Sequence, residues 1–283
     1  MITIVIPTFN NLDYLKLCIK SIKKNSKYNH EIKLHINDGS DGTLDFARSN
    51  NIFYTHSKNN IGLCSSINLI SSTVQNKYLL YAHDDMYFCP NWDETLLNEV
   101  TKIGNDSFYL SGTMIEPNSG HINFDCGNTP KNFDENKLIN NLDNLNFYDH
   151  QGSHFAPHLV EKKLWDKVGG FSEEFNPGMA SDPDFNMKLW INGVRIFKGI
   201  NKFRVYHFSS TTTRKKLNFK KNKGDITFLK KWGFSHKFFK KHYLRSRTLY
   251  VEPLKEPVKN LAYYFDLSLC KLKIFYLKVF IRN

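Results

Sequence analysis

The first hundred residues alternate between short apolar runs and segments of helical periodicity, which limits the folds that the chain can adopt. Residues 2–6 form a continuous apolar run, suited to a strand buried on both faces. Leu12, Leu15, Ile19 and Ile22 then recur at helical spacing. Strands that alternate with helices build βαβ units around a parallel sheet, so the sequence predicts an α/β fold. The predicted strands are residues 2–6, 31–36, 52–55 and 77–82, and helices begin near residues 12, 44 and 62.

Polar residues gather where three of these predicted strands end. Thr8 and Asn10 follow the first strand, Asp38 and Ser40 follow the second, and residues 83–85 follow the fourth. In open α/β sheets, ligands bind in the crevice at the carboxyl ends of the strands. We therefore expect the three clusters to line one binding site.

The second half of the chain has a weaker pattern. We expect a strand over residues 108–114, a variable loop region over 117–157, and a short helix over 158–168. A further helix over 184–192 and two strands, 194–198 and 203–208, complete the predicted fold. The histidines at positions 150, 154 and 158 have a helical spacing, but Gly152 and Pro157 interrupt any helix between them. We expect a loop near the substrate there, without a metal.

The cysteine pattern favours a reducing compartment. The chain has five cysteines, an odd number, and no two of them are spaced as CxxC, which argues against a disulfide or zinc framework. The amino-terminal residues lack the basic region and the cleavage site of a signal peptide. We therefore expect a cytoplasmic protein, which could associate peripherally with a membrane.

The acidic pair Asp84 and Asp85 directly follows an apolar strand. Adjacent side chains on a strand point to opposite faces, so the two carboxylates are expected to have different roles. We assign the metal to Asp85 and the ribose or a supporting role to Asp84, since Mg²⁺ and Mn²⁺ prefer oxygen ligands and are commonly held by one or two carboxylates together with substrate phosphates. A solvated acidic turn is the alternative interpretation.

Four motifs occur in the order and spacing found in family 2 glycosyltransferases. They are residues 4–10 (IVIPTFN), 37–43 (NDGSDGT), 59–63 (NNIGL) and the acidic pair. Over roughly residues 1–210 the chain resembles that family. The resemblance implies a GT-A fold with a mixed, mostly parallel central sheet flanked by helices. It places a nucleotide-binding half up to about residue 115 and an acceptor half up to residue 213.

The resemblance also implies a donor site for a nucleotide-diphosphate sugar, expected to be UDP-linked. Asp38 matches the acid that accepts a hydrogen bond from the base, and the acidic pair matches the DXD motif, with His83 in place of its first acid. Ile67 stands where the family often has an arginine, and the asparagine after it is retained. The expected donor-binding residues in this region are Pro7, Thr8, Asn10, Asp38, Ser40, Asn60, Gly62, Asn68 and Asp84.

Residues 179–185 (MASDPDF) look like the family's Glu-Asp-x-Asp segment, with Ser181 in place of the glutamate. Asp182 then matches the catalytic base, with Asp184 as the substitute. An acceptor hydroxyl is a poor nucleophile, and a carboxylate within hydrogen-bond reach can take its proton as the new bond forms. Capping of the helix by Ser181 or Asp182 is the alternative role.

His207 ends a predicted strand about 120 residues after the acidic pair. Its position resembles that of the late histidine that completes the metal site in many enzymes of this fold, although a lone histidine is more often structural. Imidazole suits Mn²⁺ as carboxylate does, so we expect Asp85 and His207 to hold Mn²⁺ or Mg²⁺. Arg214 and Lys215 follow and are expected to close over the diphosphate.

The net charge of +12 is unevenly distributed. Residues 1–213 carry 20 Lys and Arg against 23 Asp and Glu, whereas residues 214–283 carry 19 against 4. This basic and aromatic-rich extension is expected to be helical and to lie on an anionic membrane surface, since charged residues interrupt its apolar stretch. A helical appendage packed on the body and a homodimer contact are the alternatives. We do not expect nucleic acid as the partner.

The sequence thus predicts a metal-dependent, inverting glycosyltransferase that transfers a sugar to a hydroxyl of a glycan or lipid-linked acceptor in the synthesis of cell-surface glycans or polysaccharides. One alternative is a sugar nucleotidyltransferase, but residues 7–11 (PTFNN) lack the glycine-rich phosphate loop that it would need. Another is a non-catalytic protein that binds nucleotide sugars, an alternative favoured by the substitutions at His83, Ile67 and Ser181.

Overall fold

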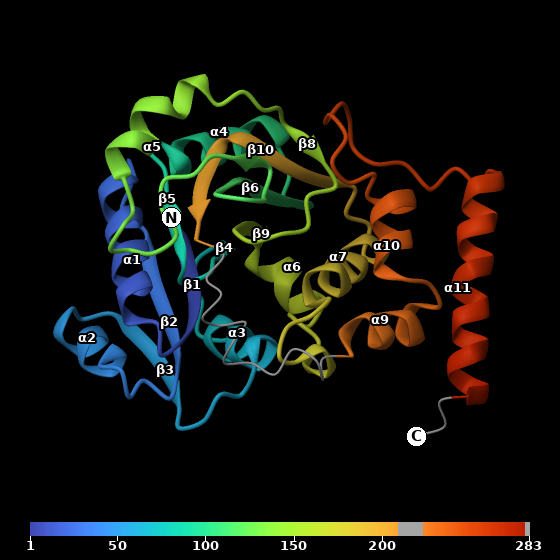
Figure 1. Cartoon of the computed structure of the whole chain (residues 1–283), viewed down its shortest axis with the longest axis horizontal. Coiled ribbons are helices and arrows are strands. Elements are labelled where there is room, and N and C mark those ends of the chain that lie inside the picture. The colour runs from blue at the N-terminus through green and yellow to red at the C-terminus, as the bar shows by residue number, and fades with distance from the viewer. Residues whose placement is uncertain (209–222, 281–283) are drawn as a thin grey trace.

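The computed structural model describes residues 1–208 and 223–280, and these residues build an α/β fold around one central sheet (Figure 1). The strand order along the sheet is β3-β2-β1-β4-β9-β6-β10-β5, with β7 paired to β6 and β8 paired to β10. The strands are β1 (Ile2–Phe9), β2 (Glu31–Asn37), β3 (Phe53–Ser57), β4 (Tyr78–Tyr81), β5 (Met86–Phe88), β6 (Phe108–Glu116), β7 (Ile122–Asn123), β8 (His150–Gln151), β9 (His158–Glu161) and β10 (Ile196–His207).

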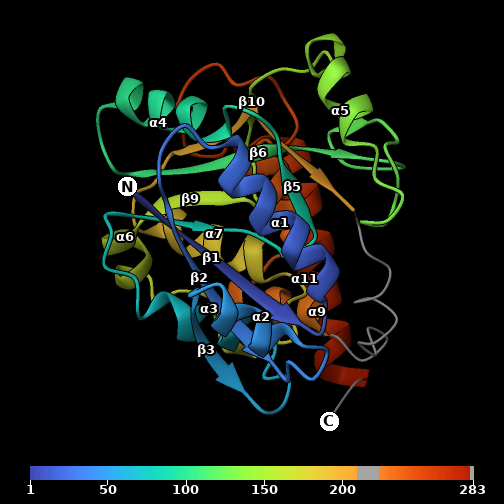
Figure 2. The same ribbon diagram turned by 90° about the vertical axis from the view of Figure 1, so that its left-hand side faces the viewer.

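The first four strands are parallel, as the alternating pattern predicts. β1 is buried over almost its whole length because helices cover both faces of the sheet. α1 buries Leu15, Cys18, Ile19 and Ile22 and packs against β5, whereas α3 packs against β1 and β2 (Figure 2). The helices of this half are α1 (Leu12–Asn25), α2 (Thr43–Ser49), α3 (Leu63–Ser71) and α4 (Trp92–Ile103).

The second half of the chain departs from the expected elements in two places. The predicted helix over 158–168 begins as strand β9, which lies antiparallel between β4 and β6 and is followed by a shorter helix, α6. A short apolar run has the same pattern in a buried strand and a buried helix, and only the tertiary pairing separates them. The predicted strands 194–198 and 203–208 are one strand, β10, whose pairing with β6 shifts register between Ile200 and Arg204.

Short elements occupy the region predicted as a variable loop, and a longer helix follows it. These elements are β7, α5 (Glu135–Asn141), the 3₁₀ turn η1 (Leu142–Asn144) and β8. α7 begins three residues earlier than predicted, at Ser181. The remaining elements before the extension are α6 (Lys162–Lys167), η2 (Glu173–Phe175) and α7 (Ser181–Ile191).

The carboxyl-terminal extension is helical, as expected, and its first part packs into the body. Phe228, Phe239, Leu244 and Leu254 belong to the main hydrophobic core. α11 packs on α9 and α10 instead, and it stands at the end of the molecule opposite to α2 and β3 (Figure 1). No described helix is long and apolar enough to span a membrane. The elements are α9 (Gly224–Trp232), α10 (His236–Phe238), η4 (Phe239–Tyr243) and α11 (Leu261–Phe280).

Candidate active site

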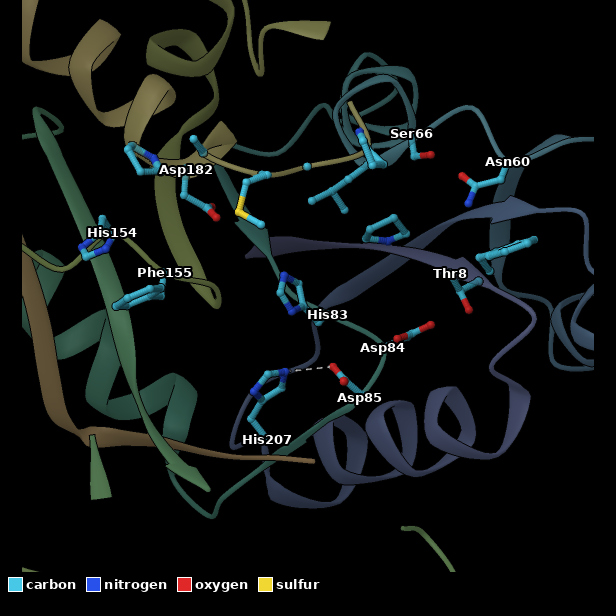
Figure 3. A pocket seen from close by; sticks show the side chains of 18 of the residues that line it. Thr8, Asn60, Ser66, His83, Asp84, Asp85, His154, Phe155, Asp182 and His207 are labelled. Carbon is cyan, nitrogen blue, oxygen red and sulfur yellow. Dashed lines mark ion pairs between the residues drawn. The ribbon is translucent and has the colours of Figure 1, made fainter. Parts of the chain in front are cut away.

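A cavity of about 730 Å³ opens between the two halves of the chain, at the carboxyl ends of β1 and β4 (Figure 3). One side carries residues from the first half, and the other carries the start of α7 and the segment before β9. Its polar lining residues are Thr8, Asn37, Asn60, Ser66, His83, Asp84, Asp85, His154, Asp182, His207, Asp225, His236 and Lys240.

Three side chains that could hold a metal ion meet in this cavity. One ligand atom from each of His83, Asp85 and His207 lies within 4.8 Å of the others. The sheet explains the meeting, because β10 runs antiparallel to β5 and pairs His207 with Met86, the residue after Asp85. The expected pair of Asp85 and His207 is therefore brought together across two strands, and His83 joins it from the end of β4.

Glu116 holds His207 from the other side. The Nδ1 atom of His207 lies 2.6 Å from a carboxylate oxygen of Glu116, and its Nε2 atom lies 3.2 Å from Asp85. Burial lowers the pKa of His207, but the charges of Asp85 and Glu116 outweigh it and raise that pKa to about 10. Burial also lowers the pKa of His83, to about 4, which keeps that imidazole neutral.

This donor set fits a divalent cation. A ligating histidine commonly donates its other ring N–H to a carboxylate, which fixes the ring and raises its basicity, and Glu116 is placed to accept that hydrogen. The raised pKa of His207 reflects two carboxylates sharing one imidazole, and a cation beside Asp85 would replace the ring proton. His83, Asp85 and His207 can therefore hold a metal, with Glu116 as the partner that orients His207.

The orienting role of Glu116 predicts a measurable loss of metal affinity. Glu116→Gln keeps the size of the side chain but removes the charge, so we expect Mn²⁺ to bind about 10- to 100-fold more weakly. Titration of the full chain with Mn²⁺, followed by electron paramagnetic resonance, would measure it. Glu135→Gln is the matched control, since that carboxylate pairs with Lys24. An unchanged Mn²⁺ affinity in Glu116→Gln would show that Glu116 does not act on the site.

The two carboxylates of the acidic pair point to different partners. Asp84 accepts a hydrogen bond of 3.0 Å from Asn11, whereas Asp85 faces His207. Burial and the neighbouring charge of Asp85 raise the pKa of Asp84. The carboxylates of Asp84 and Asp85 thus point in different directions, as expected for adjacent residues. Asp84 lies on the side of the cavity that also carries Thr8 and Asn60 (Figure 3).

Asn10, Asp38 and Ser40 form a hydrogen-bonded group beside the first strand. The amide of Asn10 donates to Asp38 at 2.8 Å and to Ser40 at 3.2 Å. Hydrogen bonds to Asp38, first from Asn10 and then from Ser40, lower the pKa of this carboxyl and keep it charged. Asn10 and Asp38 both have positive φ, which sharp turns at the strand ends require. Neither they nor Ser40 line the cavity itself, unlike Pro7, Thr8 and Asn60.

Two of the expected donor-binding residues have structural contacts instead. Asn68 lies outside the cavity lining, and its side chain bonds both the backbone N–H and the carbonyl of Phe171. Gly62 precedes α3 with a φ of +88°, and a Cβ there would collide with Asn176. Arg214 and Lys215 lie outside the described residues, so the expectation that they close over a diphosphate stays a prediction.

Asp182 faces the cavity from the first turn of α7. Its Oδ1 atom is buried and has no hydrogen-bond partner among the described residues. Burial raises the pKa of this carboxyl to about 7. The N-cap of α7 is Ala180, and the Ser181 hydroxyl donates to the carbonyl of Gly178. Neither Ser181 nor Asp182 therefore caps the helix with its side chain. A carboxylate with a pKa near neutrality and an open acceptor oxygen suits general-base catalysis.

Asp184 is different, because other residues already engage both of its oxygens. Trp232 donates to one at 2.8 Å, Ser172 donates to the other at 2.7 Å, and Lys231 forms an ion pair at 2.9 Å. Asp184 is fully buried and does not line the cavity. We therefore withdraw it as the substitute base: it attaches α9 to the body.

Comparison with known proteins agrees with this geometry. The chain resembles solved structures that share only 15% of its sequence, so the likeness concerns the fold. Staphylococcus aureus TarS 1-349 in complex with UDP superposes with a TM-score of 0.53, over 72% of this chain and 59% of that one. GalNAc-T7 with UDP, GalNAc and Mn²⁺ superposes with a TM-score of 0.56, over 73% and 43%. The fold is GT-A, as predicted.

The sequence relatives are glycosyltransferases. An uncharacterized glycosyltransferase of Rickettsia prowazekii is 28% identical over 178 residues, which cover 61% of this chain and 54% of the relative. The hyaluronan synthase of Pasteurella multocida is 26% identical over 231 residues, 78% of this chain but 22% of the synthase. The chain thus spans about half, or less, of these relatives. The Glycosyl transferase family 2 profile matches residues 3–157, and the chain belongs to this family.

Proposed function

We propose that this glycosyltransferase moves a sugar from a UDP-sugar donor to a hydroxyl of a glycan or lipid-linked acceptor, with inversion at the sugar carbon. The observation that carries the proposal is one cavity that holds a candidate metal cluster, His83, Asp85 and His207, and the carboxylate of Asp182, whose Oδ1 atom has no hydrogen-bond partner among the described residues. The UDP complexes of two GT-A neighbours support the donor class. The hyaluronan and chondroitin synthases among its relatives support a role in glycan or polysaccharide synthesis.

The donor would lie between the acidic pair and the strand ends of the first half. Asp85, His83 and His207 would hold a divalent cation, which when bound neutralises the diphosphate and stabilises the leaving group. Mn²⁺ fits this set better than Mg²⁺, because two of the three ligands are imidazoles and Mg²⁺ favours oxygen. Asp84 would bind the ribose, and Asp38 would accept a hydrogen bond from the base.

Asp182 would act on the acceptor. Its Oδ1 atom takes the proton of the acceptor hydroxyl while that hydroxyl attacks the sugar carbon from the face opposite to the leaving diphosphate. A single displacement of this kind inverts the configuration at that carbon. Because Asp182 lies on the other side of the cavity from Thr8 and Asn60, the acceptor would enter from its side (Figure 3).

The raised pKa of Asp182 predicts a pH dependence. The base works only when deprotonated, so transfer should fall as the pH drops through about 7. We expect kcat to be about tenfold lower at pH 6 than at pH 8, as for one ionising group. Initial rates at saturating donor and Mn²⁺ across this range would measure it. A profile that stays flat from pH 5 to pH 8 would contradict Asp182 as a base with this pKa.

A donor screen tests the proposed function. The full chain would be incubated with a panel of UDP-sugars and other nucleotide sugars, with Mn²⁺ or with a chelator, and release of the nucleoside diphosphate would be measured. We expect slow hydrolysis of at least one UDP-sugar, only when the metal is present. Binding of UDP-sugars without any turnover, even with acceptors added, would favour the non-catalytic alternative.

We also propose that the extension, residues 214–283, rests on an anionic membrane surface at the cytoplasmic face through its last helix, α11. α11 buries Tyr263, Cys270 and Leu277 against α9 and α10. Its opposite face exposes a row of large apolar side chains, and lysines flank this row on both sides. Such a face suits a helix that lies in the membrane interface. The exposed apolar residues are Leu261, Tyr264, Phe265, Leu269, Leu272, Phe275, Tyr276, Val279 and Phe280, and the lysines are Lys271, Lys273 and Lys278.

A charge placed in this row should weaken the binding of α11 to anionic membranes. Phe275→Glu is expected to weaken binding to vesicles of phosphatidylcholine with about 30% phosphatidylglycerol by roughly tenfold or more, because it replaces apolar burial with repulsion. Co-sedimentation of the full chain would measure it. Phe53→Glu is the matched control, since Phe53 is also half-exposed but lies on β3, away from α11. If the wild-type protein does not bind the vesicles and self-associates through α11, the exposed face of α11 is a dimer contact instead.

A further inference from the structure

A second groove adjoins the cavity on the acceptor side. It has a volume of about 510 Å³ and lies between the segment before β9 and residues of the extension. Three residues line both the groove and the cavity, namely His154, Phe155 and Lys240, so the two spaces lie side by side. The other lining residues of the groove are Lys237, Lys241, Arg245, Ser246, Arg247 and Thr248.

Most of the positive charges that line the groove have no ion-pair partner among the described residues. Its described lining includes three lysines and two arginines but no acid. Lys241 pairs with Asp266 on α11, whereas the other four cations form no ion pair within the part of the chain that the structure describes. Burial, together with the charges of Arg247 and Lys237, lowers the pKa of Lys240. Crowded like charges cost stability, and a bound anion would relieve that cost.

Where the groove meets the cavity, His154 supplies a polar group in addition to the cations. It is 4% exposed, and its Nδ1 atom lies 3.2 Å from the carbonyl oxygen of Gly152. A carbonyl only accepts, so Nδ1 carries the hydrogen and Nε2 is left as an acceptor. Nε2 is buried and has no partner among the described residues. Burial lowers the pKa of His154 to about 3, so the ring stays neutral and can accept from a sugar hydroxyl.

The junction lies on the side of the cavity that carries the base. Figure 3 shows His154 and Phe155 near Asp182, while Thr8 and Asn60 lie across the cavity. A molecule that extends from the groove into the cavity would therefore approach Asp182 without crossing the donor side.

We propose that the groove binds a phosphate group of the acceptor, so that the enzyme selects phosphate-bearing acceptors. This inference rests on the proposed function and names the acceptor class. Arginine and lysine together suit a phosphate, which offers several oxygens and up to two charges, better than a single carboxylate. Lys237, Lys240, Arg245 and Arg247 hold the phosphate, while His154 accepts from a sugar hydroxyl next to it.

The test uses the full chain saturated with Mn²⁺ and UDP, so that the donor site is filled. Glucose 1-phosphate serves as the probe, and isothermal titration measures its binding. We expect wild type to bind it and the double variant Lys237→Ala, Lys240→Met to bind at least tenfold more weakly. Arg247→Gln, which keeps a long polar side chain at a residue of positive φ, should also weaken binding. Thermal melting of each variant verifies its fold.

The matched control removes two charges from α11 with Lys271→Ala and Lys273→Ala, and it should bind the probe as wild type does. A dodecyl ester of glucose 1-phosphate, used below its micelle concentration, distinguishes the two sources of phosphate. If the dodecyl ester binds more tightly than glucose 1-phosphate, the acceptor is lipid-linked. If the two bind equally, the acceptor is soluble. If wild type binds UDP but not glucose 1-phosphate, or if the groove variants bind glucose 1-phosphate as tightly as wild type, the phosphate site is wrong and the proposed function still stands. Absence of UDP binding would instead contradict the proposed function itself.

Discussion

Asp182→Asn is expected to lower kcat for sugar transfer by about 10²- to 10⁴-fold, the usual contribution of a general base. The amide has nearly the shape of the carboxylate but cannot take the proton of the acceptor hydroxyl at neutral pH. The native Oδ1 atom is buried without a hydrogen-bond partner among the described residues, so no stabilising contact is lost with its charge. Steady-state rates with a donor and acceptor identified by the screen would measure the effect.

Donor binding is the control for this variant. The affinity for UDP with Mn²⁺ should stay within about twofold of wild type, because Asp182 lies on the acceptor side of the cavity. Asp166→Asn, which changes a surface acid paired with Lys162, should transfer sugar normally. Full turnover by Asp182→Asn would contradict its assignment as the base, and Asp184 could not replace it because Lys231, Trp232 and Ser172 engage its oxygens.

Asp85→Ala is expected to abolish metal-dependent donor binding. Asp85 is the one carboxylate in the cluster of three candidate ligands, so its loss removes the charge that offsets the cation. Since even the outer partners of metal ligands are worth 10- to 100-fold in affinity, we expect Mn²⁺ to bind at least about 100-fold more weakly. Electron paramagnetic resonance of free Mn²⁺ during titration would report this directly, and UDP affinity should fall with it.

Asp84→Asn separates the two members of the pair. Its carboxylate contacts Asn11 rather than His207, so this variant should bind Mn²⁺ nearly as wild type does and lose affinity only for the nucleotide. If Asp84→Asn and Asp85→Ala lost Mn²⁺ binding equally, the division of roles between the two carboxylates would be wrong.

Much of the fold could be predicted because the first half is locally consistent. Apolar runs, turn residues and helical periodicity all indicate the same βαβ order, and the parallel strands β1 to β4 follow it. β9 could not be predicted, because its four residues become a strand only through pairing with β4 and β6. Such pairing depends on partners about 50 and 80 residues away, which no local pattern records.

The site shows the same division. Asp85 and His207 were predicted as a pair, and the register of β10 against β5 brings them together. In the acidic motif His83 reads as a substitution, yet it lies with the other two candidate ligands. The motifs give no sign of Glu116, although an acid just after the predicted strand 108–114 is the kind of residue that marks the other clusters. His154 and Phe155 fell in a region without a recognisable pattern, and tertiary packing alone places them at the cavity.

If the cluster of His83, Asp85 and His207 binds a nucleotide-sugar donor through a divalent cation, UDP binding must depend on the metal. Isothermal titration of UDP into the full chain, with Mn²⁺ and with a chelator, measures this dependence. We expect UDP to bind at least about tenfold more weakly with the chelator than with Mn²⁺, and Asp85→Ala to weaken UDP binding to a similar extent even with Mn²⁺. Equal UDP affinity with and without the metal, or no UDP binding at all, would contradict it.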